Sequence, residues 1–242
     1  MGILLIQTPT DEARRPWAVT RQFLSGSAMT WLDPATGRPQ SSASGLTILG
    51  MLSPDAARSL FGKGPFPLET IFERSADDAG PPCFDLEREA AVKSRSVVSD
   101  FGSENVVARL EGGSSERAGE HVVFSSHLDH VGRKTPDTIV GGDDIYNGAY
   151  DNASGVAALL AIARAFSALP ARTDRSLVFI ALTAEENGLL GSDYFGRNPS
   201  VEGELVANVN MDGVLMFHPL RDIVAFGANH STLLDPSPRR RR

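Results

Sequence analysis

The sequence is poor in cysteine and has no long apolar run. Cys83 is the single cysteine among 242 residues, which excludes an internal disulfide framework and a zinc site built from several thiolates. No apolar run approaches the roughly 20 residues that a membrane-spanning helix needs, so we expect no membrane span. Residues 1–6 are apolar, but they are too short for a signal-peptide core and lack its basic lead-in. We predict a strand there and expect the natural N-terminus to lie upstream.

Positive charge is also in short supply. The chain carries 23 Lys and Arg residues against 30 Asp and Glu residues, a formal net charge of -7. Such a chain gives no electrostatic reason to expect nucleic acid as a partner. Residues 239–242 are all arginine, and we interpret them as a solvated chain end. The content of 41% apolar and 22% charged residues is ordinary for a globular protein, with room for one large domain or two modest ones.

The first 90 residues differ in composition from the rest. They are rich in Pro, Gly and Ser and contain no chemical motif. A helix is predicted at residues 53–61, because Ser53 is a good N-cap, Pro54 suits the first helical position and Gly62 ends it. From residue 91 onwards, short β-rich runs alternate with helical ones. We therefore divide the chain into domains at residues 1–90 and 91–242.

The second domain is predicted to be an α/β sheet covered by helices. The run at residues 176–182 is almost wholly apolar, as in a strand that is buried on both faces. The run at 152–169 spaces its apolar residues for one buried helical face. In sheets of this kind, ligands bind beyond the carboxyl ends of the strands. The predicted strands are residues 105–110, 121–126, 176–182 and 205–211, and the predicted helices are residues 152–169 and 188–195.

Polar residues follow the predicted strands or begin the predicted helix. Each has an ordinary structural explanation when taken alone, because acids are common at helix N-termini as caps or as partners of the helix dipole. In the triplet H-L-D, the histidine and the aspartate point the same way in an extended chain, so the aspartate is placed to fix the tautomer of the histidine. The residues concerned are His127, Asp129, Asp151, Glu185, Glu186 and Asp212.

Taken together, these residues indicate a metal site. All six can face one crevice, since they lie at strand ends or at a strand-to-helix turn. One imidazole with several carboxylates and no thiolate suits Zn²⁺ or another first-row metal with nitrogen and oxygen ligands. The carboxylates outnumber what one catalytic zinc needs, which favours a two-metal site with ions about 3.5–4 Å apart.

Four segments carry a resemblance to a known family. The segments S-S-H-L-D-H-V-G, I-Y-N-G-A-Y-D-N-A-S-G-V-A-A-L-L, T-A-E-E-N-G-L-L-G-S and N-V-N-M-D resemble, in order and spacing, the co-catalytic zinc aminopeptidases related to aminopeptidases S and Y. The resemblance covers roughly residues 96–230. It implies a mixed, mostly parallel central sheet flanked by helices, as in zinc exopeptidases. Residues 1–90 look like part of a β-rich protease-associated domain, a module often found ahead of the catalytic sheet in this family.

The resemblance also implies the ligands of two zinc ions. His127 and Asp212 would bind the first ion, Glu186 would bind the second, and Asp151 would bridge both. The family has a second histidine on the second zinc, well downstream of the N-M-D segment. His218 is too close to Asp212 for that place, and His230 matches a different family segment. We therefore expect an incomplete second site and a chain that is truncated at both ends.

The remaining implied roles concern catalysis. Glu185 would be the general base that takes a proton from a metal-bridging water, and Asp129 would orient His127. The peptide bond between Asp151 and Asn152 would be cis. The implied substrate is a peptide, from which N-terminal residues are removed. Members of the family with the added domain are usually exported, so a secreted or periplasmic location is implied.

Several alternatives remain open on the same fold. Carboxypeptidases share it, and so do glutaminyl cyclases, which use one zinc. A non-catalytic relative or an inactive fragment is a further alternative, although the retained residues at 127, 151, 185, 186 and 212 argue against inherited loss. A zinc-independent α/β-hydrolase is disfavoured, because the sequence has no G-x-S-x-G motif.

Overall fold

The structure is a computed structural model of the chain, and it describes residues 2–40, 45–75, 80–86, 88–89, 91–93, 95–134, 141–214 and 225–232. The chain divides into two compact units at Phe101 and Gly102. This division lies about ten residues after the predicted boundary. The described residues between 80 and 105 form no helix or strand, so the boundary falls within a long irregular segment.

The first unit contains a small parallel sheet and four short helices. Strand β1 (Gly2–Ile6) pairs with β2 (Ile48–Leu52), which confirms the strand predicted at the start of the chain. The helix predicted at 53–61 is confirmed as α3 (Pro54–Phe61), with the Ser53 side chain accepting a hydrogen bond from the backbone N–H of Ala56. The other helices are α1 (Pro9–Arg14), α2 (Trp17–Leu24) and α4 (Leu68–Ser75).

This unit is not β-rich in its described residues. Its two strands have five residues each, whereas its four helices have six to eight. Local hydrogen bonds explain part of the difference. Thr8 and Asp11 form a reciprocal capping box at the start of α1, which stabilises a helix too short to show apolar periodicity. Tertiary packing explains more, since Ala57 of α3 and Leu68 of α4 are buried.

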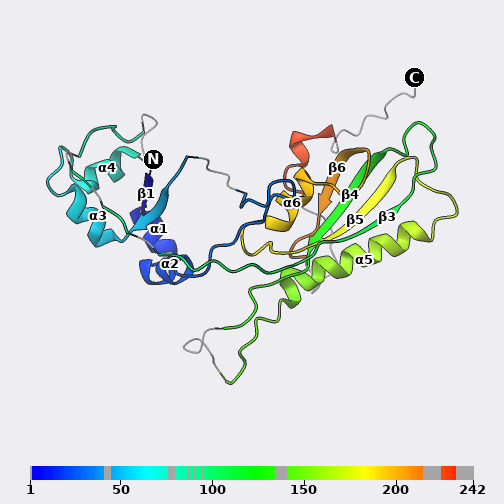
Figure 1. Cartoon of the computed structure of the whole chain (residues 1–242), viewed down its shortest axis with the longest axis horizontal. Coiled ribbons are helices and arrows are strands. Elements are labelled where there is room, and N and C mark those ends of the chain that lie inside the picture. Colours follow the sequence, from blue (N-terminus) through cyan, green and yellow to red (C-terminus); the bar gives the residue numbers. More distant parts are fainter. Residues whose placement is uncertain are drawn as a thin grey trace. The chain divides into compact units, whose positions relative to one another are not determined.

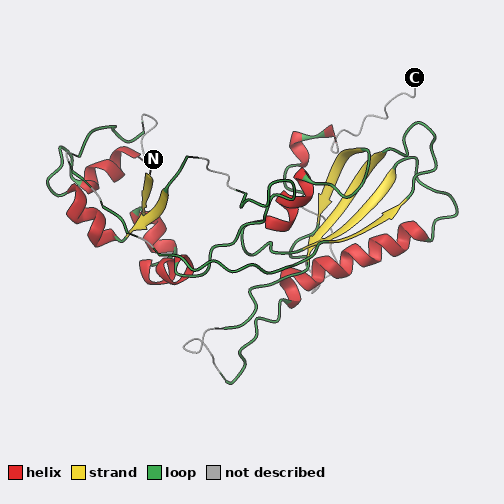
Figure 2. Cartoon of the chain, viewed as in Figure 1, coloured by secondary structure: helices red, strands yellow, loops and turns green. Residues whose placement is uncertain are grey.

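The second unit is built on a four-stranded sheet with the order β3-β5-β4-β6. Strand β4 (Glu120–His127) is parallel to both β5 (Ser176–Leu182) and β6 (Glu204–Asn210). Strand β3 (Val106–Leu110) is antiparallel to β5 and forms one edge of the described sheet. The four strands lie side by side in Figure 2. The prediction of a mixed, mostly parallel sheet is confirmed.

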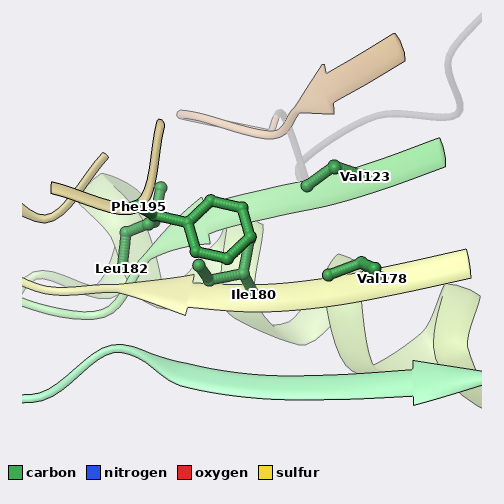
Figure 3. Packing of buried hydrophobic residues seen from close by; sticks show 5 residues of the cluster. All are labelled: Val123, Val178, Ile180, Leu182 and Phe195. Carbon is green, nitrogen blue, oxygen red and sulfur yellow. The ribbon is translucent and has the colours of Figure 1, made fainter. Parts of the chain in front are cut away.

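Two helices supply apolar side chains to opposite faces of this sheet. Helix α5 (Ser154–Ser167) runs along one face (Figure 1), where Leu159 packs with Leu177 and Phe179 of β5. On the other face, Phe195 of α6 (Leu190–Arg197) packs on Ile180 in a cluster (Figure 3). Because alternate residues of a strand face opposite ways, the apolar run of β5 is buried on both sides, as predicted. The other members of this hydrophobic cluster are Val123, Val178 and Leu182.

The topology brings three chain segments to one edge of the sheet. Because β4, β5 and β6 are parallel, their carboxyl ends meet there, at His127, Leu182 and Asn210. A kinked turn, η2 (Ala149–Ala153), in which Asp151 and Asn152 have non-helical backbone angles, leads into α5. Among the helices in the described part of the chain, none combines the length and the apolar character that crossing a bilayer requires.

Candidate metal centre

His127 is the last residue of β4, and its side chain is 2% exposed. Its Nδ1 donates a hydrogen bond to the backbone carbonyl of Asp129 at 3.0 Å. A carbonyl only accepts, so this bond places the proton of the neutral ring on Nδ1 and leaves the lone pair on Nε2. Nε2 is buried without a hydrogen bond, although Asp151 Oδ1 lies 3.0 Å away. A buried imidazole nitrogen with a free lone pair is suited to binding a metal.

Two carboxylates face this nitrogen. Nε2 of His127 lies 3.0 Å from Asp151 Oδ1 and 3.6 Å from Asp212 Oδ1. Two ligand atoms of a tetrahedral zinc with bonds near 2.0 Å lie about 3.3 Å apart. One imidazole and two carboxylates at this separation fit a zinc ion in both donor type and spacing. We call these three residues the first cluster.

A second group of potential ligands shares Asp151 with the first. Nδ1 of His130 lies 2.6 Å from Glu186 Oε1, and single ligand atoms of His130, Glu186 and Asp151 all lie within 4.8 Å of one another. We call these three residues the second cluster. Asp151 thus belongs to both clusters and Glu186 to the second.

His130 was absent from the predicted site. The resemblance places the second imidazole downstream of Asp212, so the second histidine of H-L-D-H was not predicted as a ligand. His218 lies outside the described residues. His230 is exposed in a short 3₁₀ turn and belongs to neither cluster. The signal that could have identified His130 is its position in the loop after β4, at the same sheet edge as the predicted ligands.

Glu185 lies beside the first cluster and next to a member of the second. Its Oε2 is 3.9 Å from Nε2 of His127, and it belongs to neither group of potential ligands. Its backbone N–H donates a hydrogen bond to Oδ1 of Asp129 at 3.2 Å. This contact ties the segment after β5 to the segment after β4. A carboxylate held near a metal site without being a ligand is placed for proton transfer.

Asp129 contacts His127 in a different way from the one predicted. Its carboxylate oxygen is 3.8 Å from His127 Nδ1, which is too long for a hydrogen bond. The backbone carbonyl of Asp129 accepts that hydrogen bond instead, while its carboxylate holds the backbone of Glu185. Asp129 therefore positions both the histidine and the glutamate, each through a different group.

Asn152 joins the segments that carry the first cluster. The peptide bond between Asp151 and Asn152 is cis, as predicted. The Asn152 side chain, 2% exposed, donates to Ser126 Oγ and to the Met211 carbonyl, both at 3.0 Å. Its Oδ1 accepts from the backbone N–H groups of Gly155 and Gly213.

These partners of Asn152 neighbour the ligands themselves. Ser126 precedes His127, and Met211 and Gly213 flank Asp212. At Gly155, a Cβ atom would lie 2.3 Å from Oδ1 of Asn152, so only glycine allows this close approach. Asn152 was predicted only to share the cis bond with Asp151, and its hydrogen-bond network was not predicted.

Burial and crowding of acids change the proton affinities of the site. Burial raises the pKa of Glu185, and the neighbouring carboxylates Glu186 and Asp212 raise it further, against the opposing effect of His127. For His127, burial lowers the pKa. The nearby carboxylates, Glu185 above all, and the hydrogen bond to Asp129 raise it by more, so the pKa lies above the usual 6.5. Without a metal, His127 and Glu185 therefore hold their protons to a higher pH than the same side chains do in water.

Zinc binding is consequently expected to depend on pH. The ion must displace the proton of His127, whose pKa is raised, so the affinity is highest above that pKa and falls as the pH drops through it. One displaced proton lowers the affinity by about tenfold per pH unit. Calorimetric titration with zinc between about pH 6 and pH 8, in buffers of different ionisation enthalpy, would measure the affinity and the protons released. A constant affinity with no proton release would contradict this account.

The comparison with protein families agrees with the geometry. The sequence profile described as Peptidase family M28 matches residues 105–237, a stretch that contains both clusters and Glu185. Among solved structures, the chain is similar to a peptidase M28 precursor from Shewanella amazonensis SB2B, with 31% sequence identity and a TM-score of 0.31. That match covers 39% of this chain and only 18% of the precursor. Since the profile spans more than half of the sequence, the chain belongs to peptidase family M28.

Proposed function

We propose that the chain is a zinc-dependent aminopeptidase, which hydrolyses N-terminal residues from peptides. The observation that carries the proposal is Nε2 of His127, which is buried, makes no hydrogen bond and faces two carboxylates with a third beside them. Membership of family M28 supports the metallopeptidase class, because that family includes co-catalytic zinc aminopeptidases. The resemblance in the four site segments supports removal of residues from the N-terminus.

In this proposal the two clusters hold the metal. His127 and Asp212 would hold the first zinc, Glu186 would hold the second, and Asp151 would contribute to both sites. Bound zinc lowers the pKa of coordinated water towards about 7 and polarises the carbonyl of the scissile bond. The proton transfers are carried out by side chains of the protein.

Glu185 is the proposed general base. Its carboxylate accepts a proton from the attacking water and returns it to the leaving amine. Burial and nearby carboxylates raise its pKa, which brings the glutamate closer to the pH at which a base and its conjugate acid both work well. Asp129 keeps the backbone of Glu185 in place through the hydrogen bond to its N–H.

Two further parts of the proposal rest on the resemblance. Residues 1–90 are proposed to be part of a protease-associated domain, and the protein is proposed to work outside the cytoplasm, secreted or in the periplasm. Neither bears on the chemistry of the clusters.

Substrate comparison tests the proposal. The zinc-loaded chain is expected to release p-nitroaniline from aminoacyl-p-nitroanilides and to be inactive on the N-acetylated forms, because an aminopeptidase requires a free amine. Glutaminyl peptides test for cyclase activity, and peptides with a free C-terminus test for carboxypeptidase activity. Cyclisation of glutaminyl peptides, or release of C-terminal residues, without aminopeptidase activity would replace the proposal with one of those activities.

A further inference from the structure

The loop between β5 and α6 carries Glu185 on a backbone of uncommon conformation. Two of its residues other than glycine, Ala184 (φ +53°) and Leu189 (φ +62°), lie in the left-handed region. Side chains rarely adopt this region, because their Cβ atom comes too close to the following carbonyl oxygen. Such a backbone persists only where surrounding contacts hold it. The loop therefore depends on the groups that fix its two ends, at Thr183 and Gly191.

Asn105, the residue before β3, contacts both ends of this loop. Its Oδ1 accepts a hydrogen bond from the backbone N–H of Thr183 at 3.0 Å, and its Nδ2 donates one to the carbonyl of Gly191 at 2.9 Å. Close by, the hydroxyl groups of Ser103 and Thr183 form a further hydrogen bond at 2.5 Å. One side-chain amide thereby joins the residue after β5 to the first turn of α6.

The contact at Gly191 is too close for any other residue. A Cβ atom there would lie 2.6 Å from Oδ1 of Asn105 and 2.2 Å from the carbonyl oxygen of Thr183, so only glycine allows it. Backbone hydrogen bonds also close the loop at this point. The N–H of Gly191 donates to the carbonyl of Thr183, and the N–H of Leu190 donates to that of Ala184, both at 3.1 Å. Asn105 thus holds the loop where its ends meet.

We infer that Asn105 is a positioning residue for Glu185, because it holds together the two ends of the loop that presents this carboxylate to the first cluster. Glu185 follows Thr183 by two residues, and its Oε2 lies 3.9 Å from Nε2 of His127. Asp129 holds the backbone N–H of Glu185 itself, so the two side chains fix the segment at different points. The inference rests on the proposed function, which makes Glu185 the general base.

Nuclear magnetic resonance of the folded chain tests the conformation of the loop without metal or substrate. The Cα and Cβ chemical shifts of Ala184 and Leu189 report their backbone angles. In Asn105→Ala these shifts are expected to move away from left-handed values, while those of Val178 and Ile180 inside β5 stay as in wild type. If Asn105 only adds stability, the free energy of unfolding falls but the shifts of the folded chain do not change, and that result would overturn the inference.

Kinetics test the consequence for Glu185. Wild type, Asn105→Ala and the control Asn198→Ala are assayed on an aminoacyl-p-nitroanilide at zinc concentrations that saturate each. In Asn105→Ala, kcat is expected to fall about 10–100-fold, as for other residues that orient the groups of a metal site. KM is expected to stay the same, because Glu185 acts in the transition state and not in substrate binding. Asn198, whose amide donates to Tyr194 within its own helix end, is expected to be replaceable without effect.

Two further variants separate the loop from the fold. Asn105→Asp keeps an oxygen for the N–H of Thr183 but cannot donate to Gly191, so its kcat is expected to lie between those of Asn105→Ala and wild type. Adding Ala184→Gly to Asn105→Ala is expected to raise kcat again by about fivefold, since glycine adopts a positive φ without strain. No recovery in the double variant would contradict a role that acts through the loop conformation.

The outcomes separate the inference from the proposed function. An active wild type together with unchanged kcat in Asn105→Ala would overturn the role of Asn105 and leave the proposed function standing. Unchanged shifts of Ala184 in that variant would do the same. A zinc-loaded wild type that does not hydrolyse the substrate would overturn the proposed function, and the inference with it.

Discussion

Replacing Glu185 with glutamine is expected to lower kcat by about 10²–10⁴-fold, the usual contribution of a general base, while both zinc ions remain bound. Glutamine has the same shape as glutamate, but its amide cannot accept the proton of the attacking water. The residue belongs to neither cluster, so the ligand sets stay complete. Its backbone hydrogen bond to Asp129 also stays, because the substitution leaves the main chain unchanged.

Two measurements on the same preparation decide the outcome. Turnover of an aminoacyl-p-nitroanilide and zinc content are compared for wild type, Glu185→Gln and the control Glu116→Gln. The control changes an exposed glutamate in a turn that is far from Glu185 in the sequence. The control is expected to match wild type in both. Near-normal kcat in Glu185→Gln would show that another group accepts the proton, and loss of zinc would show that Glu185 is a ligand.

Replacing Asn152 with alanine is expected to weaken both the fold and the metal site. The change removes two donors and one acceptor from a buried or partly buried network, and each buried partner left without a hydrogen bond costs about 1–3 kcal/mol. We expect the free energy of unfolding of this unit to fall by about 2–5 kcal/mol. Zinc affinity is expected to fall by about 10–100-fold, as for other residues that orient metal ligands.

Matched variants identify which hydrogen bonds matter. Asn152→Asp keeps an oxygen for Gly155 and Gly213 but loses the donors to Ser126 and Met211, so its affinity is expected to lie closer to the alanine variant than to wild type. Asn198→Ala removes an asparagine whose amide bonds only within its own helix end, and it is expected to retain wild-type zinc affinity. Chemical unfolding and zinc titration measure the two effects. Unchanged affinity in Asn152→Ala would mean that the ligands hold their places without this network.

Much of the sheet could be predicted because its signals are local. The run at 176–182 is apolar at nearly every position, and β5 is buried on both faces. The helix at 53–61 carries its own N-cap in Ser53. The first unit was harder, because helices of six to eight residues show too little periodicity to separate them from loops. Their formation depends on capping and on packing, which a single sequence does not display.

The residues of the two clusters could likewise be predicted only in part from local signals. Strand ends predicted the positions of His127, Glu185 and Asp212, since parallel strands deliver their carboxyl ends to one edge. The contact of His130 with Glu186 joins residues that are 56 positions apart. The network of Asn152 likewise reaches 26 positions back and about 60 forward. No local pattern encodes such contacts, so only the folded chain shows them.

Removal and return of zinc test the central claim most directly. The chain is assayed with an aminoacyl-p-nitroanilide after purification, after treatment with a chelator and after addition of zinc, alongside Glu185→Gln. We expect hydrolysis to be lost with the metal and restored by zinc in the wild type, and to stay low in Glu185→Gln even with zinc bound. Hydrolysis that persists in the metal-free chain would contradict a metallopeptidase built on these clusters.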